Sequence, residues 1–148
     1  MGLTGKNNEE KAWTFLKGKI KNDFGVSGLM GELFAESGLN PQNLQNSYEK
    51  KLGFTDATYT AAVDSGSYAN FVHDSAGYGV AQWTFWSRKE ALLNYVRALG
   101  ASIGDLEAQL GFLYKELSES YPSVLAALKT ATSVRAASDK VLTDFERP

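Results

Sequence analysis

Apolar residues recur at steps of three and four along both ends of this 148-residue chain, and this spacing limits its fold more than any other feature. Sustained alternation of apolar and polar residues, which is typical of half-buried strands, does not occur. We therefore expect a mostly α fold, with helices over residues 8–24, 28–37, 87–99, 102–121, from 122 onward and 134–145.

The middle of the chain, residues 39–85, has a different composition. It is rich in Asn, Gln, Ser, Gly and Tyr, and its helical signals are weak, as over residues 55–63. A long stretch of this kind inside a compact domain favours function over a plain linker. We expect a polar, aromatic loop lobe, which could include a small hairpin, to form one wall of a cleft beside the helices.

Length and composition exclude several classes of protein. The length predicts a single domain over residues 1–148, and a net charge of −2 argues against a general nucleic-acid binder. No apolar run approaches the ~18 residues needed for a membrane span, and the polar start MGLTGKNNEE is not a signal peptide. With no cysteine and one histidine, the chain lacks the residues for disulfides, a thiol nucleophile or a multi-histidine metal site. His73 alone does not exclude a carboxylate-rich metal site.

One glutamate stands at an unusual place in the stretch GLMGELFAESGLNP, residues 28–41. Ser27 is the expected N-cap of this helix and Gly38 its C-terminal stop. At about 100° per residue, Glu36 projects within about 20° of Leu29, at the edge of the apolar stripe that also includes Leu33 and Phe34. Partial burial there would raise the pKa of the carboxyl, as a general acid requires. The alternative is a solvated glutamate in the last helical turn.

Two motifs carry a resemblance to a known family. The segments AESGLNP at residues 35–41 and GYGVAQWT at 77–84 resemble the lysozyme and lytic-transglycosylase superfamily, and in detail the phage tail-type lysozyme domains. In those domains an E-S-x-x-N-P helix end supplies the catalytic acid, and a G-x-x-Q-W element lines the glycan cleft. The resemblance extends through residues 87–89 and the terminal segment 145–148. Both motifs in this order are more specific than either alone.

The resemblance implies a role for each matching residue. Glu36 would protonate the glycosidic oxygen, and Ser37 would steady its carboxyl or a substrate group. Gln82 would bind the sugar or its acetamido group, while Tyr78 and Trp83 would offer flat faces to sugar rings.

Other residues are weaker candidates. Tyr48 is a further substrate-binding candidate on the same lobe. Core packing is the alternative for Trp83 and Trp86, and it is the better reading for at least one of them. Arg88 could contact a carboxylate of the substrate, or it could be a surface arginine.

A second carboxylate is harder to assign. Retaining glycosidases place it about 5–5.5 Å from the acid and inverting ones about 6.5–9.5 Å. Asp74 and Asp64 are candidates, with Glu49 as a third, although loop carboxylates more often serve as caps or turn residues. Some members of the superfamily use one glutamate together with the acetamido or 6-hydroxyl group of the substrate. Hydrolysis and transglycosylation therefore both remain open.

We expect a peptidoglycan-cleaving enzyme that acts on the β-1,4 bond between N-acetylmuramic acid and N-acetylglucosamine. By the resemblance it needs no metal or organic cofactor and works outside the cell or on a virion, as a tail lysozyme or endolysin. The isolated domain is expected to be monomeric and could belong to a longer chain. The alternatives are a lytic transglycosylase, a glycan-binding tail module without catalysis, and a helical interaction domain in which Glu36 is a surface residue.

Overall fold

A computed structural model describes residues 3–146, and the predicted mostly α fold is confirmed. Four terminal residues lie outside the described range, namely Met1, Gly2, Arg147 and Pro148. The last two belong to the terminal segment 145–148 that contributed to the resemblance. No helix within the described range is long and apolar enough to cross a membrane. The helices are α1 (Asn8–Ile20), α2 (Asp23–Ser37), α3 (Asn46–Leu52), α4 (Asp56–Ser65), α5 (Trp86–Ala98), α6 (Leu106–Glu119), α7 (Pro122–Thr130), α8 (Val134–Lys140) and the short π-helix η1 (Val141–Glu146).

The chain forms two compact units. Unit 1 contains the chain up to Leu39 and again from Leu110, and unit 2 contains the continuous segment Asn40–Gln109. The residue that ends unit 2 and the residue that resumes unit 1 are neighbours in helix α6. The predicted acid, Glu36, therefore belongs to unit 1, and the motif at residues 77–84 belongs to unit 2.

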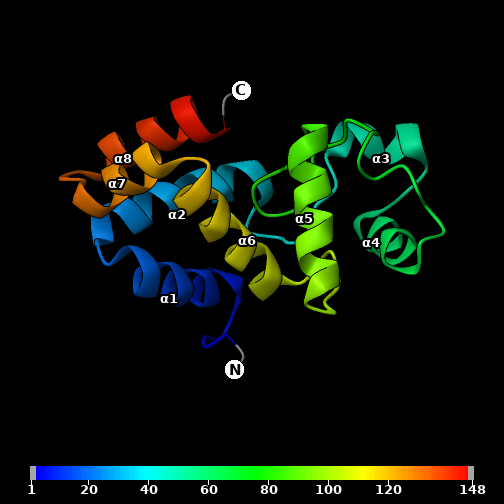
Figure 1. Cartoon of the computed structure of the whole chain (residues 1–148), viewed down its shortest axis with the longest axis horizontal. Helices are drawn as coiled ribbons and strands as arrows, with labels where there is room; N and C mark the ends of the chain where they lie inside the picture. The colour runs from blue at the N-terminus through cyan, green and yellow to red at the C-terminus, as the bar shows by residue number, and fades with distance from the viewer. Residues whose placement is uncertain (1–2, 147–148) are drawn as a thin grey trace. The chain divides into compact units, whose positions relative to one another are not determined.

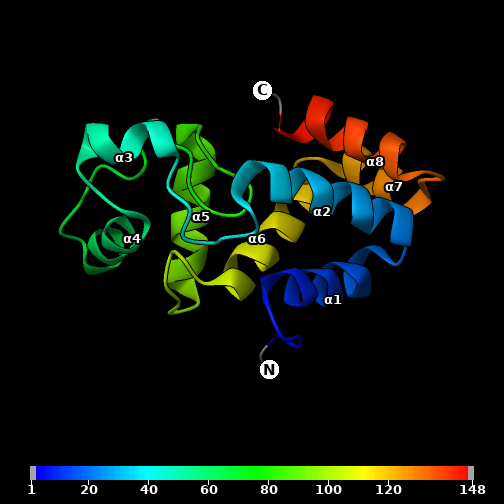
Figure 2. The same ribbon diagram turned by 180° about the vertical axis from the view of Figure 1, so that it is seen from behind.

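Helix α2 is the central helix of unit 1. It packs against α1, α7, α8 and η1, and both ribbon views show it between α1 and the pair α7–α8 (Figures 1 and 2). A Cβ atom on Gly25 would lie 1.9 Å from the carbonyl oxygen of Leu128, and one on Gly28 would lie 2.5 Å from Ala137 Cβ. Two glycines thus allow the close approach of α2 to α7 and α8. The residues of α2 that fill the core are Val26, Leu29, Met30 and Leu33.

The start of α2 differs from the prediction. The N-cap is Asn22, whose side chain accepts a hydrogen bond from the Phe24 N–H at 3.1 Å, and Ser27 lies inside the helix. The first helix, expected over residues 8–24, ends earlier: α1 stops at Ile20, and Lys21 caps it in the left-handed conformation. Gly25 sits in the first turn of α2. The Asn22 amide also donates to three carbonyls near the end of α7, those of Leu128, Lys129 and Ala131. These tertiary hydrogen bonds set the start of α2 at Asp23, whereas the local sequence signals predicted a start at residue 28.

The other boundaries agree in part. Gly38 caps α2 in the left-handed conformation with φ 65°, and Pro122 is the first residue of α7, as predicted. Helix α6 begins at Leu106 and not at Ser102, and the last predicted helix is divided into α8 and η1. The weak signal near residue 55 corresponds to α4, which Thr55 opens with a capping box.

Aromatic side chains form the core of unit 2. The buried Tyr59 ring of α4 contacts four other rings, those of Phe54, Tyr68, Phe71 and Tyr78, with centroids 5.3 to 6.0 Å apart. Extended pairing within residues 3–146 is limited to two isolated bridges, Leu44–Tyr78 and Tyr78–Trp83. The lobe predicted to be polar and aromatic is therefore built around its tyrosines.

Candidate active site

Glu36 lies in the last turn of α2, where Gly38 closes the helix by donating its N–H to the Phe34 carbonyl at 2.8 Å. Glu36 is exposed, whereas Leu33 on the same side of the helix is completely buried. Partial desolvation raises the pKa of the Glu36 carboxyl above its usual value, and the negative charge of Glu32 one turn earlier adds to the shift. The direction agrees with the expectation, and it favours the protonated form that a general acid uses.

Ser37 stabilises the turn that carries this glutamate. Its side chain is buried, donates to the Leu33 carbonyl at 3.0 Å and accepts from the Leu39 N–H at 3.2 Å. Leu39 has a positive φ of 61°, so the chain turns sharply here. Through these bonds Ser37 fixes the backbone on both sides of Glu36.

The motif at residues 77–84 forms a tight hairpin-like turn in unit 2. Tyr78 and Trp83 exchange two backbone hydrogen bonds at 3.1 and 3.0 Å. Gly79 and Gln82 both have positive φ values, 86° and 51°. A Cβ atom on Gly79 would lie 2.8 Å from the Gln109 side chain, so glycine is needed for this approach as well as for the turn. This turn matches the small hairpin that the sequence left open.

The expectation that Tyr78 and Trp83 present ring faces to sugars is wrong. Tyr78 is 0% exposed and Trp83 is 1% exposed. The Tyr78 hydroxyl is 2.6 Å from the hydroxyl of Thr60, and burial raises its pKa. Both rings belong to the core. Core packing was the alternative for Trp83 and Trp86, and Trp83 is the one of the two that is buried.

Two other predicted substrate-binding residues retain some exposure. The Gln82 amide nitrogen donates to the carbonyls of Asn43 and Gly79, at 2.9 and 3.1 Å, and so holds the turn together. Tyr48 in α3 is half-buried, with the Lys51 ammonium 4.9 Å from its ring centroid. Their roles toward a sugar stay predictions.

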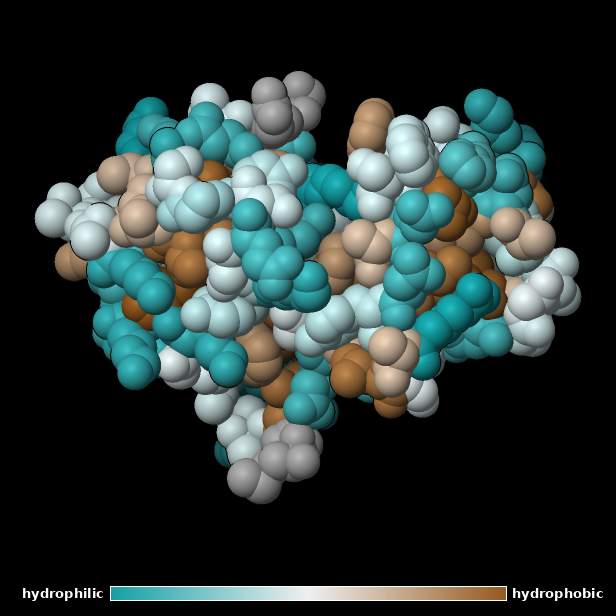
Figure 3. Space-filling view, viewed as in Figure 1, coloured by the Kyte–Doolittle hydropathy of each residue, from teal (hydrophilic) through white to brown (hydrophobic). Residues whose placement is uncertain are grey.

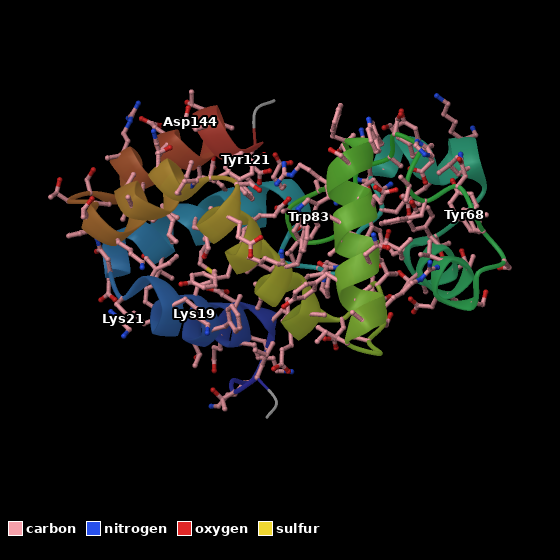
Figure 4. All side chains as sticks on the ribbon, viewed as in Figure 1. Lys19, Lys21, Tyr68, Trp83, Tyr121 and Asp144 are labelled. Carbon is pink, nitrogen blue, oxygen red and sulfur yellow. The ribbon has the colours of Figure 1, made fainter. Side chains whose placement is uncertain are left out.

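Asp74 has a structural environment that does not suit a nucleophile. Its carboxylate accepts hydrogen bonds from Lys89 at 2.6 Å, Tyr59 at 2.6 Å, Tyr68 at 2.8 Å and the Ala76 N–H at 2.9 Å. Figure 4 labels Tyr68, which comes from the segment after α4. Burial raises the pKa values of both tyrosines, and their bonds to Asp74 raise them further. Burial lowers the pKa of Lys89, and Asp74 opposes this shift.

Asp64 lies near the end of α4 and Glu49 lies within α3, both ordinary positions for helix carboxylates. Asp64 accepts a hydrogen bond from the Ser102 hydroxyl and another from the Ile103 N–H at 2.8 Å, so it holds the turn before α6. Glu49 lies within α3 and its backbone carbonyl closes that helix through Gly53. The turn role that the sequence left as the alternative for Asp64 is the one observed.

Two buried polar residues that organise unit 2 were missed. Gln109 accepts from the Val80 N–H at 2.9 Å and donates to the Pro41 and Ile103 carbonyls at 2.7 Å each. Lys89 binds Asp74 and the Ala76 carbonyl. Each polar residue falls on the apolar face of its helix, three residues before or after a buried leucine, and this signal could have identified it.

No group of three or more His, Cys, Asp or Glu side chains between residues 3 and 146 is arranged to hold a metal ion. A protein-family model described as phage tail lysozyme matches residues 7–148 of the chain. Searches of the curated proteins and of the solved structures gave no match.

Proposed function

Because the chain belongs to the phage tail lysozyme family, we propose that it cleaves the β-1,4 bond between N-acetylmuramic acid and N-acetylglucosamine, with Glu36 as general acid. The family covers residues 7–148 and implies a lysozyme-like activity on peptidoglycan. The family match supports the general activity, while the choice of bond and the role of Glu36 as general acid are our proposals.

The observation that carries the proposal is the state of Glu36. It stands in the AESGLNP motif at the end of α2, with a pKa that partial desolvation and Glu32 raise. A carboxyl that keeps its proton to higher pH can deliver it to the glycosidic oxygen as the bond to the leaving sugar breaks. Gln82 and Tyr48 are proposed to contact the sugar.

A lytic transglycosylase is the second candidate, and one observation favours it. Asp74 and Asp64, the two aspartates considered as nucleophile or base, are both engaged in hydrogen bonds that hold loops of unit 2. A transglycosylase needs no second carboxylate, because the 6-hydroxyl of the muramyl residue attacks its own anomeric carbon and leaves an anhydro end.

The test is digestion of purified peptidoglycan by the wild-type protein and by Glu36→Gln. We expect the variant to lose a factor of about 10² to 10⁴ in rate, the usual contribution of a general acid. Its unfolding temperature should be no lower than that of the wild type, because the substitution removes a carboxylate whose ionised form is disfavoured by desolvation and by Glu32. Glu90→Gln, an exposed glutamate of α5, is the matched control. Glycan cleavage by Glu36→Gln at the wild-type rate would overturn the assignment.

Product analysis separates the two reactions. New reducing ends identify a hydrolase, whereas anhydro-muramyl ends detected by mass spectrometry identify a transglycosylase. We propose that the protein acts at the bacterial cell wall as part of a phage particle, in line with the phage-related family.

A further inference from the structure

We propose that three exposed rings of unit 2, those of His73, Phe85 and Trp86, form a binding platform for a glycan chain. We call these residues the aromatic platform. The proposal rests on the proposed function only for the choice of glycan as the ligand. These rings are distinct from the buried pair Tyr78 and Trp83, for which the family resemblance implied sugar stacking.

The three side chains lie next to one another at the surface. The Trp86 ring centroid is 6.0 Å from that of His73, with 29° between the planes, and 6.1 Å from that of Phe85, with 37° between them. Phe85 is 62% exposed and Trp86 is 48% exposed, and His73 is exposed as well. Hydrophilic and hydrophobic residues are interspersed over the face drawn in Figure 3, and single exposed apolar residues are ordinary. A contiguous group of exposed rings is less common, and such a patch is a candidate binding surface.

The buried Lys89–Asp74 pair fixes the two segments that carry the platform rings. His73 precedes Asp74, and the Phe85 carbonyl accepts a hydrogen bond from the Lys89 N–H at 3.0 Å in the first turn of α5. The ion pair between Lys89 and Asp74 therefore joins the two segments that supply the rings. Because these segments are fixed before a ligand arrives, binding would cost less conformational entropy.

The chemistry of the surface fits a sugar. Pyranose rings offer apolar C–H faces that pack on aromatic rings, while their hydroxyl groups need polar partners. Such partners stand beside the platform in the sequence and are exposed, namely Ser75, Thr84 and Ser87. Phe85 also follows directly after the motif at residues 77–84, within the segment that the family model matches.

The size of the platform also argues against a protein partner. A fully buried aromatic side chain covers roughly 150–250 Å², so three partly exposed rings offer roughly 300 Å². A stable protein interface buries about 800 Å² on each side. The platform is therefore too small for such an interface by itself, and it suits a short run of sugar rings.

The experiment measures binding of the β-1,4-linked hexamer of N-acetylglucosamine by tryptophan fluorescence and calorimetry. The Glu36→Gln background prevents cleavage during the titration. We expect Trp86→Ala and Phe85→Ala in this background to weaken binding by about tenfold each, and Trp86→Phe to retain most of it. Phe24→Ala and Leu99→Ala remove apolar side chains of similar exposure elsewhere and should leave binding unchanged. Circular dichroism verifies that each variant is folded.

The possible outcomes are distinct. If the parent protein does not bind the hexamer, the platform proposal is wrong. It is also wrong if Trp86→Ala and Phe85→Ala bind the hexamer as well as the parent does. Either result holds even if Glu36→Gln abolishes cleavage. Cleavage by Glu36→Gln would overturn the proposed acid without affecting a loss of binding in the Trp86 variant. Phosphatidylglycerol vesicles serve as a second probe. If the platform variants lose vesicle binding and keep hexamer binding, the surface is a lipid contact and the glycan proposal is wrong.

Discussion

The ammonium nitrogen of Lys89 lies 2.6 Å from Oδ1 of Asp74, and their side chains are 0% and 1% exposed. Lys89 also donates to the Ala76 carbonyl at 2.7 Å, and Asp74 accepts from two tyrosine hydroxyls. The pair thus links helix α5 to the segment before the motif at residues 77–84. A buried pair of this kind has a high desolvation cost, which these additional hydrogen bonds offset.

Lys89→Met should destabilise the protein by about 3–5 kcal/mol, because it leaves the Asp74 carboxylate buried without its cation. The free energy of unfolding in urea, followed by circular dichroism, measures the loss. Lys115→Met is the matched control, since it breaks an exposed pair with Glu119 that should contribute at most about 1 kcal/mol. Equal losses in the two variants would contradict the interpretation of the buried pair.

Glu32→Gln should lower the pKa of Glu36, because it removes the like charge that contributes to the upward shift. The shift should be partial, since desolvation is the larger cause. Carbon-13 NMR of the Glu36 carboxyl measures the pKa directly, and the basic limb of the pH–activity profile should move to lower pH. Because the folded pKa lies above the unfolded value of 4.5, the stability that this group contributes is present below pH 4.5 and is lost as pH rises through the folded pKa. An unchanged Glu36 titration in the variant would contradict the assigned cause.

Tyr59, Tyr68 and Tyr78 should resist ionisation in the folded protein, because burial raises the pKa of each above its usual value near 10. The unfolded chain loses these protons near pH 10 and the folded chain keeps them, so stability should fall as pH rises above about 10. Absorbance at 295 nm reports ionisation, and circular dichroism reports unfolding. We expect three of the seven tyrosines to ionise only as the protein unfolds. Ionisation of all seven in the folded protein near pH 10 would contradict the prediction.

Gly25→Ala and Gly31→Ala should have opposite effects, although both lie in α2. A Cβ on Gly25 would clash with the Leu128 carbonyl at 1.9 Å, whereas one on Gly31 meets no atom within 4 Å. We expect a loss of about 1–3 kcal/mol or more for Gly25→Ala, since backbone must move, and a gain of up to about 1 kcal/mol for Gly31→Ala. Thermal unfolding of the two variants tests the pair. A stable Gly25→Ala protein would show that α2 and α7 do not approach this closely.

Local signals predicted most of the helices, but they missed α3 and placed some helix ends wrongly. The capping preference of Gly38 and the fixed φ of Pro122 act within a few residues, so both positions could be predicted. The start of α2 could not, because Asn22 caps it while binding carbonyls more than one hundred residues away in the chain. A tertiary contact of this kind leaves no mark in a short window of sequence.

The candidate site was predicted unevenly for a similar reason. The position of Glu36 follows from helical geometry and its pKa shift from nearby residues, so the sequence was informative there. Whether an aromatic ring faces the core or the solvent depends on the whole of unit 2. Trp83, within the motif, is buried, whereas Trp86, only three residues later, is exposed. Their short separation in sequence could not distinguish the two.

Unit 1 is assembled from both ends of the chain, and the continuous segment Asn40–Gln109 lies between them in sequence. A protease that cut within this segment would leave unit 1 as two peptides without a shared backbone. The packing of α2 against α7 and α8, at Gly25 and Gly28, would then be what keeps the peptides associated. A nicked molecule should accordingly migrate as one species in a native gel and separate into fragments only in denaturant.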